Sequence, residues 1–156
     1  MGVRIIEYSP ELKNDFKQLN LEWIEKHFVV EQHDRDQLEH ADVHIIAGGG
    51  RIFFAQDKTT GEILGTVALI KETEFLYEIA KMAVAPKARG KKIGKLLMQH
   101  LIDEAKKTAG AEKIYLESNT VLVPAITMYR SFGFQEVKDF KSLFERANIK
   151  MELNLV

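Results

Sequence analysis

The sequence predicts a fold of the α/β class, of the α+β type: a mixed, mostly antiparallel sheet of about seven strands flanked by helices. Residues 51–56 and 63–70 are apolar runs on either side of a polar turn, which is typical of a β-hairpin. Residues 77–84 form a third apolar run, which ends at a basic, glycine-bearing turn followed by an amphipathic helix. Residues 149–156 alternate apolar and polar side chains, as a half-buried strand does.

Length and composition narrow the class of protein. A chain of 156 residues can bury the core of one domain and is too short for two, so we expect a single domain over residues 1–156. The formal net charge is −1 with acids and bases interspersed, which favours neither a nucleic acid nor a membrane as partner. There is no cysteine, no signal-peptide core and no apolar run of membrane-spanning length. We therefore expect a cytoplasmic protein.

The N-terminal region reads as a strand followed by helices. Residues 3–8 suit a first strand, and Pro10 marks a helix start. Apolar residues then keep helical spacing as far as Phe28, with an expected break near Asn20 that would make a helical hairpin. The polar tract that follows brings His40 and His44 four residues apart. A metal site there is conceivable, but histidines scattered among acids are more often a solvated surface, so we expect no metal.

The remaining elements follow in order. The strands at 51–56, 63–70 and 77–84 should form an antiparallel meander. A strand at 112–118 and a helix at 123–132 come next. The chain then closes with paired strands at 134–137 and 149–156.

The turn between the third strand and the long helix is the most informative stretch. Helical spacing predicts one buried face that continues to about residue 108, formed by Ile93, Leu96, Leu97, Leu101 and Ala105. The free N–H groups at the helix start then point into a segment that carries two glycines and five basic residues. This combination indicates an anion site, most simply for phosphate, against the alternative of a basic helix start that faces water.

Two familiar phosphate loops do not fit. Gly90 and Gly94 are one residue too close for a Walker A loop, and no Ser or Thr follows Lys95. The Gly-x-Gly-x-x-Gly dinucleotide fingerprint is also absent, since the run of three glycines at 48–50 precedes a strand.

Two motifs resemble those of the GNAT superfamily of N-acetyltransferases. The stretch from Arg89 to Gly94 is similar to its acyl-CoA-binding motif Arg/Gln-x-x-Gly-x-Gly/Ala, with Lys92 in place of the first glycine. Downstream, the stretch from Ala125 to Phe134 resembles the later signature Ala-Ile-x-x-Tyr-x-x-x-Gly-Phe. The resemblance covers nearly the whole chain. It implies the GNAT fold, with splayed central strands that hold acyl-CoA, and acetyl-CoA as co-substrate.

The resemblance also implies which residues bind the cofactor. The pantetheine arm would follow the strand edge at Met82, Ala83 and Val84, where a backbone N–H would polarise the thioester carbonyl. Asn119 is a candidate for a pantetheine contact, because Leu122 stands where many members carry an asparagine. The pyrophosphate would be held by backbone N–H groups of the turn formed by Arg89, Gly90, Lys91, Lys92, Ile93, Gly94 and Lys95.

Two side chains are candidates for proton transfer. Glu78 is a carboxylate on an otherwise apolar strand, in line with the glutamate that many members use as general base; its alternatives are a solvated side chain or a salt bridge to Lys81. Tyr129 matches the family tyrosine that gives its proton to the CoA thiolate, and its alternative is a core tyrosine.

The expected activity is transfer of an acetyl group from acetyl-CoA to a primary amine of a small molecule, by direct attack in a ternary complex. A protein-lysine acetyltransferase and a non-catalytic acyl-CoA sensor remain alternatives. The family's N-terminal helices usually cover the acceptor site, so Trp23 and Phe28 would either line it or, as we favour, anchor the core. The family is often dimeric, and the closing strand at 149–156 offers an edge on which a second copy could pair.

Overall fold

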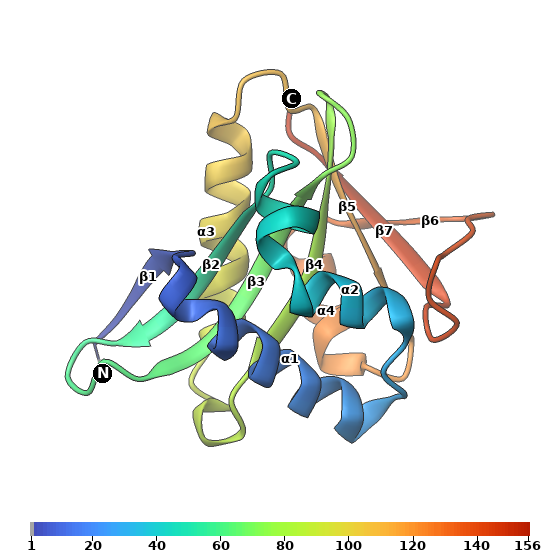
Figure 1. Ribbon diagram of the computed structural model, residues 1–156. Helices are drawn as coiled ribbons and strands as arrows, with labels where there is room; N and C mark the ends of the chain where they lie inside the picture. The colour runs from blue at the N-terminus through green and yellow to red at the C-terminus, as the bar shows by residue number, and fades with distance from the viewer. Residues whose placement is uncertain (1) are drawn as a thin grey trace.

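The computed structural model describes residues 2–156 and places seven strands in one sheet, in the order β1-β2-β3-β4-β5-β7-β6 (Figure 1). All neighbouring strands are antiparallel except β4 and β5, which are parallel. The predicted mixed, mostly antiparallel sheet is thus confirmed, and β2, β3 and β4 form the predicted meander. The strand bounds are β1 Val3–Glu7, β2 Arg51–Asp57, β3 Ile63–Lys71, β4 Leu76–Val84, β5 Lys113–Ser118, β6 Gln135–Val137 and β7 Ile149–Asn154.

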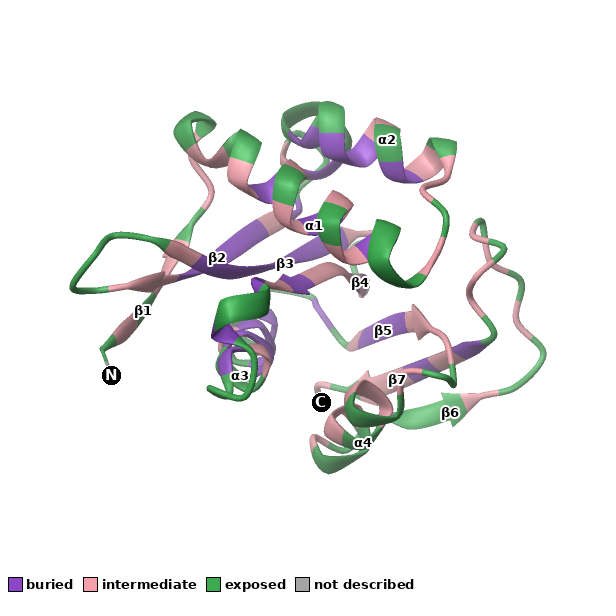
Figure 2. Cartoon of the chain, turned by 90° about the horizontal axis from the view of Figure 1, so that it is seen from below, coloured by how far each residue is buried: buried purple, intermediate pink, exposed green. Residues whose placement is uncertain are grey.

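Helices cover both faces of the sheet (Figure 2). The helices α1 (Lys13–His27) and α2 (Gln32–Glu39) lie on one face, and α3 (Ile93–Lys107) and α4 (Val123–Ser131) lie on the other. Short helical turns join them: η1 at Pro10–Leu12, a π-helical turn η2 at Asp42–Ile46, and η3 at Pro86–Ala88. Among the described residues, no helix is both long and apolar enough to cross a membrane.

Each face of the sheet has its own apolar core. Below β2 and β3, α3 buries Ile93, Leu97 and Leu101 against the sheet. On the other face, Phe16 of α1 meets the ring of Phe54 edge-on, with 6.5 Å between ring centroids. Leu96, expected on the buried face of α3, is 45% exposed, because Met98 and Ile102 complete that face instead.

The predicted break in the first helix is wrong. Helix α1 runs without interruption from Lys13 to His27, and Asn20 is buried in its middle. The Asn20 side-chain amide donates to the carbonyl of Phe16 one turn earlier at 2.9 Å, so the polar group is satisfied within the helix. The second arm of the hairpin is α2, which lies in the tract that the sequence suggested was a solvated surface.

The closing strand, expected to offer an edge to a second copy, is partly covered within the chain. Strand β7 is paired with β5 on one side and with β6 on the other. On the β6 side only Lys150, Met151 and Glu152 are paired, so β6 covers part of β7 and forms the edge of the sheet there.

Strands β4 and β5 pair only at their beginnings. Leu76–Ile79 lies beside Lys113–Leu116, and no pairing follows although β4 continues to Val84 and β5 to Ser118. Two parallel strands that separate in this way leave unpaired backbone groups along their facing edges. The gap between them positions the candidate site.

Candidate active site

A cavity of about 540 Å³ opens where β4 and β5 separate. Its walls come from five parts of the chain: the second half of β4, the turn that leads into α3, the end of β5, α4, and the segment before β7. Trp23 and Phe28 from α1 and its C-terminal end complete one side, with 6.1 Å between their ring centroids. These two side chains therefore line the cavity as well as packing against the core of the α1 face, which corrects our preference for a core role alone.

The separation of the strands coincides with a β-bulge in β4. Thr66 of β3 is opposite Ala83, but Ala68 is opposite Ala80, so two residues of β4 face one residue of β3. Lys81 takes up the extra length with a φ of 55°, in the left-handed region that non-glycine residues rarely adopt. The bulge bends β4 away from β5, and the edge formed by Met82, Ala83 and Val84 lines the cavity.

The turn before α3 supplies the basic end of the cavity. Gly90 has a φ of 79° and Lys92, the residue before the first turn of α3, has a φ of 62°. The position where the motif has its first glycine thus does require a left-handed backbone, which costs a lysine on the order of 1 kcal/mol. The residues of this turn that line the cavity are Arg89, Gly90, Lys92, Ile93, Gly94 and Lys95; Lys91, also expected to bind the cofactor, is not among them.

Gly94 shows that the turn leaves room for a ligand. A methyl group added there would come no closer than 3.9 Å to Met82, and would lie 4.0 Å from Val84 and Met128. All three of these side chains line the cavity, so a methyl group would fit the fold but fill part of the cavity. The absence of a side chain at Gly94 is therefore not required by packing within the chain.

Glu78 lies on β4 just before the strands separate and is partly buried in the cavity wall. Burial, reinforced by the negative charges of Glu117 and Glu72, raises the pKa of the Glu78 carboxyl to about 8. The alternative of a salt bridge to Lys81 is wrong, because the Lys81 ammonium binds Asp34 at 2.5 Å. Glu117, whose negative charge opposes ionisation of Glu78, accepts a hydrogen bond from the Ser142 hydroxyl at 2.5 Å.

Tyr129 comes from α4 on the opposite wall of the cavity. Its ring packs against Phe134, with 6.2 Å between centroids, and burial raises the pKa of the phenol to about 12. A carboxylate with a raised pKa and a phenol thus line one cavity. Titratable groups with shifted pKa values in a cavity are typical of sites for acid–base chemistry.

Asn119 is also in the cavity wall, but its side chain is used within the chain. Its Nδ2 donates to the carbonyl of Arg146 at 2.7 Å, and its Oδ1 accepts from the N–H of Val121 at 2.9 Å. The first of these bonds connects the end of β5 to the segment before β7. Leu122, which replaces the usual asparagine, lines the cavity as an apolar residue.

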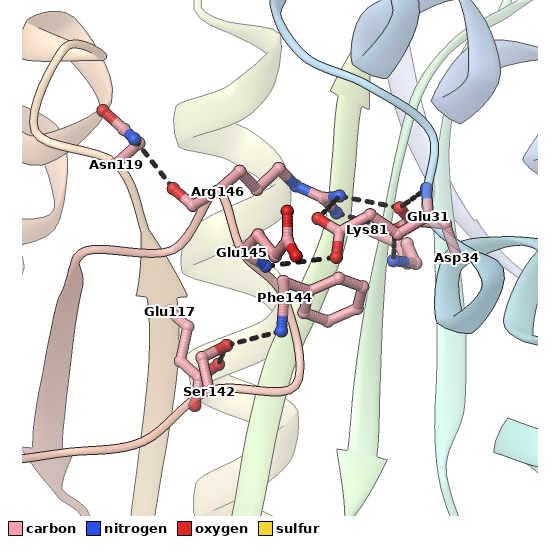
Figure 3. Close-up of polar contacts among 9 residues, drawn as sticks. All are labelled: Glu31, Asp34, Lys81, Glu117, Asn119, Ser142, Phe144, Glu145 and Arg146. Atoms are coloured by element: carbon pink, nitrogen blue, oxygen red, sulfur yellow. Dashed lines mark hydrogen bonds and ion pairs between the residues drawn. The ribbon is translucent and has the colours of Figure 1, made fainter.

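Sequence reasoning expects acceptor-selecting residues in the segment 138–148 but names none of them individually, and this segment forms the part of the wall that precedes β7. Phe144 and Arg146 line the cavity, and a network of hydrogen bonds and ion pairs connects this segment to Asp34 and Lys81 (Figure 3). Nothing in their spacing links these residues, which are more than a hundred positions apart from end to end. Within residues 2–156 there is no group of three or more His, Cys, Asp and Glu side chains that could hold a metal ion.

Comparison with known proteins agrees with this geometry. An IAA acetyltransferase of Azospirillum brasilense is 35% identical over 86 residues, which are 54% of this chain and 56% of that protein. The chain thus spans little more than half the length of this curated relative. A GNAT-family acetyltransferase structure from Staphylococcus aureus Mu50 has a TM-score of 0.87 at 25% identity, and covers 99% of this chain and 100% of its own.

A second solved structure shows a similar fold with the cofactor in place. The phosphinothricin acetyltransferase of Sinorhizobium meliloti, solved in complex with acetyl-CoA, has a TM-score of 0.77 at 18% identity; the match covers 99% of this chain and 89% of that one. Residues 16–134 of the present chain match the Acetyltransferase (GNAT) family. The chain therefore belongs to the GNAT family of acetyltransferases.

Proposed function

We propose that the protein transfers an acetyl group from acetyl-CoA to the primary amine of a small molecule by direct attack. One observation carries this proposal: Glu78 and Tyr129, a proton acceptor and a proton donor, line one cavity together with a free strand edge and a basic helix start. Family membership supports the choice of acetyl-CoA as the donor. A direct transfer is favoured because none of the 156 residues is a cysteine that could carry the acetyl group as a thioester.

The cavity fits acetyl-CoA at both of its ends. The N–H groups of the turn from Arg89 to Lys95 and its basic side chains would hold the pyrophosphate, and the room at Gly94 allows close approach. The pantetheine arm would lie along Met82–Val84, whose backbone groups have no strand partner on the β5 side. When bound, acetyl-CoA supplies an acetyl group activated as a thioester.

Glu78 would take the proton that the attacking amine must lose. A carboxyl with a pKa of about 8 is ionised in an appreciable fraction near neutral pH, and is basic enough to accept a proton from a nitrogen that is acquiring positive charge. The surrounding carboxylates, Glu117 and Glu72, keep the local potential negative. This potential would attract a cationic amine to the site.

Tyr129 would give a proton to the departing thiolate. A phenol with a pKa of about 12 keeps its proton at physiological pH, and it can pass that proton to the thiolate where binding and desolvation raise the basicity of the sulfur. It stands across the cavity from β4, on a different wall from Glu78. Acceptor and donor are thus separate groups, and neither has to serve both steps.

The acceptor side of the cavity favours a small molecule. Trp23, Phe28 and Phe144 bring aromatic rings from two separate parts of the chain to this wall. Apolar walls with a few polar groups are typical of small-ligand sites. A second positive charge on the acceptor would find Glu117 close to Glu78.

The proposal is tested by following thiol release from acetyl-CoA in the presence of spermidine, lysine, glucosamine or phenylethylamine. The protein contributes no thiol of its own, so the reagent reports CoA alone. We expect at least one amine to accelerate release, and mass spectrometry to show that amine acetylated once. A lysine-bearing peptide in the same assay separates a protein acceptor from a small molecule. Tight binding of acetyl-CoA without amine-dependent release would instead support the sensor alternative.

A further inference from the structure

A single buried carboxylate joins three distant parts of the chain beside the cavity. Asp34 of α2 is fully buried. Its Oδ1 accepts from Lys81 Nζ at 2.5 Å and from one Arg146 nitrogen at 2.6 Å; its Oδ2 accepts from the other Arg146 nitrogen at 2.7 Å and from the N–H of Glu31 at 2.9 Å. The carboxylate therefore has a donor for each of its lone pairs.

The two cations come from different parts of the chain and meet at the Asp34 carboxylate (Figure 3). Lys81 is the residue that forms the bulge in β4, and Arg146 belongs to the segment between β6 and β7. Both cations lie against the ring of Phe144, whose centroid is 4.6 Å from Lys81 Nζ and 4.4 Å from Arg146 Cζ. Glu31 adds a second tie, because its carboxylate accepts from Arg146 at 3.2 Å and from the N–H of Glu145 at 3.1 Å.

This network is expected to add little to the stability of the fold. Removing charges from water costs about as much as their attraction returns, so buried ion pairs add little net stability. What they do supply is geometry, since a bidentate Arg–carboxylate pair fixes both position and orientation. Here, the groups held in place are the strained backbone of Lys81, next to the edge formed by Met82–Val84, and the Phe144 and Arg146 side of the cavity wall.

We propose that Asp34 is a positioning residue for acetyl transfer, which acts through Lys81 on the donor side of the cavity and through Arg146 on the acceptor side. Through Lys81 it would hold the bulge that turns the β4 edge toward the thioester. Through Arg146 it would hold the aromatic wall against which the amine packs. The inference rests on the proposed function, because it takes the β4 edge as the donor side and the segment before β7 as the acceptor side.

Lys81 and Arg146 are the two arms through which Asp34 would act, and substituting each residue in turn separates their effects. Asp34→Asn would leave the buried Lys81 ammonium without a charged partner and Arg146 with Glu31 alone, and it is expected to compromise folding, so Lys81→Met and Arg146→Gln are the informative variants. Lys81→Met should raise the dissociation constant of acetyl-CoA about fivefold or more, as measured by calorimetry with the stoichiometry kept at one. Arg146→Gln should leave that constant unchanged and raise the KM of the best amine of the panel by a similar factor of about five.

Arg51→Gln is the matched control. Arg51 also bridges two carboxylates, Glu7 at 2.6 Å and Glu104 at 2.9 Å, but it lies on β2 and does not line the cavity. This variant should leave both constants at their wild-type values even where its thermal midpoint falls. Such a result would show that the loss of a bridging arginine does not by itself change substrate constants.

Several results would overturn the inference. If the network serves only folding, Lys81→Met and Arg146→Gln will lower the active fraction while both constants stay as in the wild type. If both variants raise both constants equally, the two arms do not act separately. If the wild-type protein does not bind acetyl-CoA, or no amine accelerates thiol release, the proposed function fails and the inference with it; wild-type turnover with unaltered constants in the variants refutes the inference alone.

Discussion

The half of the sheet around β2 and β3 is built from buried apolar residues, whereas the junction between β4 and α3 carries strained and charged residues. In the first region, buried apolar strands pack on the apolar face of α3, and Phe53, Val67 and Leu97 are buried in one apolar core. In the second, Lys81 and Lys92 adopt left-handed backbone conformations, and Glu78 holds a carboxyl in a partly buried place. Features that oppose folding are thus concentrated where the cavity forms. Such features are expected where residues serve function at some cost to stability.

The largest effect is expected at Glu78. Replacing it with Gln removes the proposed proton acceptor and should lower kcat/KM by about 10²–10⁴-fold. Because the carboxyl is active when ionised, the wild-type rate should rise with pH through the pKa of about 8, and this limb should be lost in Glu78→Gln. Glu117→Gln is the matched control: it removes a charge that raises the pKa, so the limb should move to lower pH. A wild-type profile in Glu78→Gln would contradict the assignment.

Glu78→Gln, which should lower activity, should raise the stability of the fold. The pKa of Glu78 is higher in the folded protein, at about 8, than the 4.5 of an unperturbed carboxyl, so the folded state binds the proton more tightly. The wild type should therefore lose stability as pH rises from about 4.5 to 8, since its buried carboxyl must ionise. Thermal unfolding should show Glu78→Gln gaining on the wild type over that interval, with the largest difference above pH 8. A constant difference across this range would contradict the raised pKa.

In the first region, the large effect should be on folding alone. Leu97 is fully buried under β3, and Leu97→Ala should lower the free energy of unfolding by about 2–5 kcal/mol, as cavity-forming substitutions do. At a temperature where the variant is folded, its dissociation constant for acetyl-CoA should equal that of the wild type. Denaturant unfolding and calorimetry measure the two quantities, and an equal loss in both would erase the distinction between the regions.

An intermediate effect is expected at Gly94. A methyl group there meets no atom closer than 3.9 Å beyond its chain neighbours and the backbone of its own helix, so Gly94→Ala should fold as well as the wild type. The methyl group would occupy the cavity where the cofactor approaches the helix start, and should weaken acetyl-CoA binding by about tenfold, or about 1.4 kcal/mol. Gly65→Ala is a contrasting variant, since its methyl group would lie 3.0 Å from Ile93 and 3.1 Å from Leu97, and should disturb packing first. Unchanged binding in Gly94→Ala would place the cofactor elsewhere.

The smallest effect is expected at Lys92. Its φ of 62° suits glycine, so Lys92→Gly should raise the free energy of unfolding by up to about 1 kcal/mol. Lys92→Ala keeps the strained backbone while removing the charge, so comparing the two variants by denaturant unfolding isolates the backbone term. Both should bind acetyl-CoA alike if the lysine side chain acts only as a charge. Equal stability of the two variants would show that this residue is not strained.

Local patterns in the sequence sufficed for most of the fold. The pattern of apolar residues placed the hairpin of β2 and β3, which is buried almost throughout, and the long helix α3, which buries one face; it also placed the closing pair β6 and β7. Asn20 misled this reasoning: a polar residue in the middle of a helix indicated a break, yet its amide finds a partner one turn away. Leu96 was also misplaced, since the buried stripe of α3 turns toward Met98 and Ile102.

The candidate site was predictable only where one continuous segment forms it. The turn before α3 and the Tyr129 signature are each contained within a short stretch, so their residues could be named from motifs. Asp34, Lys81 and Arg146 meet only after three elements have packed together, and an ion pair between distant charges leaves no periodic signal. The bulge at Lys81 was equally hidden, because nothing in the run from Leu76 to Val84 indicates a left-handed residue.

The most direct test of this account is a titration with acetyl-CoA followed by hydrogen exchange with and without the cofactor. We expect one site per chain, with protection confined to the β4 edge at residues 80–84, the turn at 86–95 and the start of α4. These segments belong to the site and not to the region around β2 and β3. The absence of binding, or protection that falls on α1 and α2 but spares the β4 edge and the turn, would contradict the claim that the gap between β4 and β5 is the acetyl-CoA site.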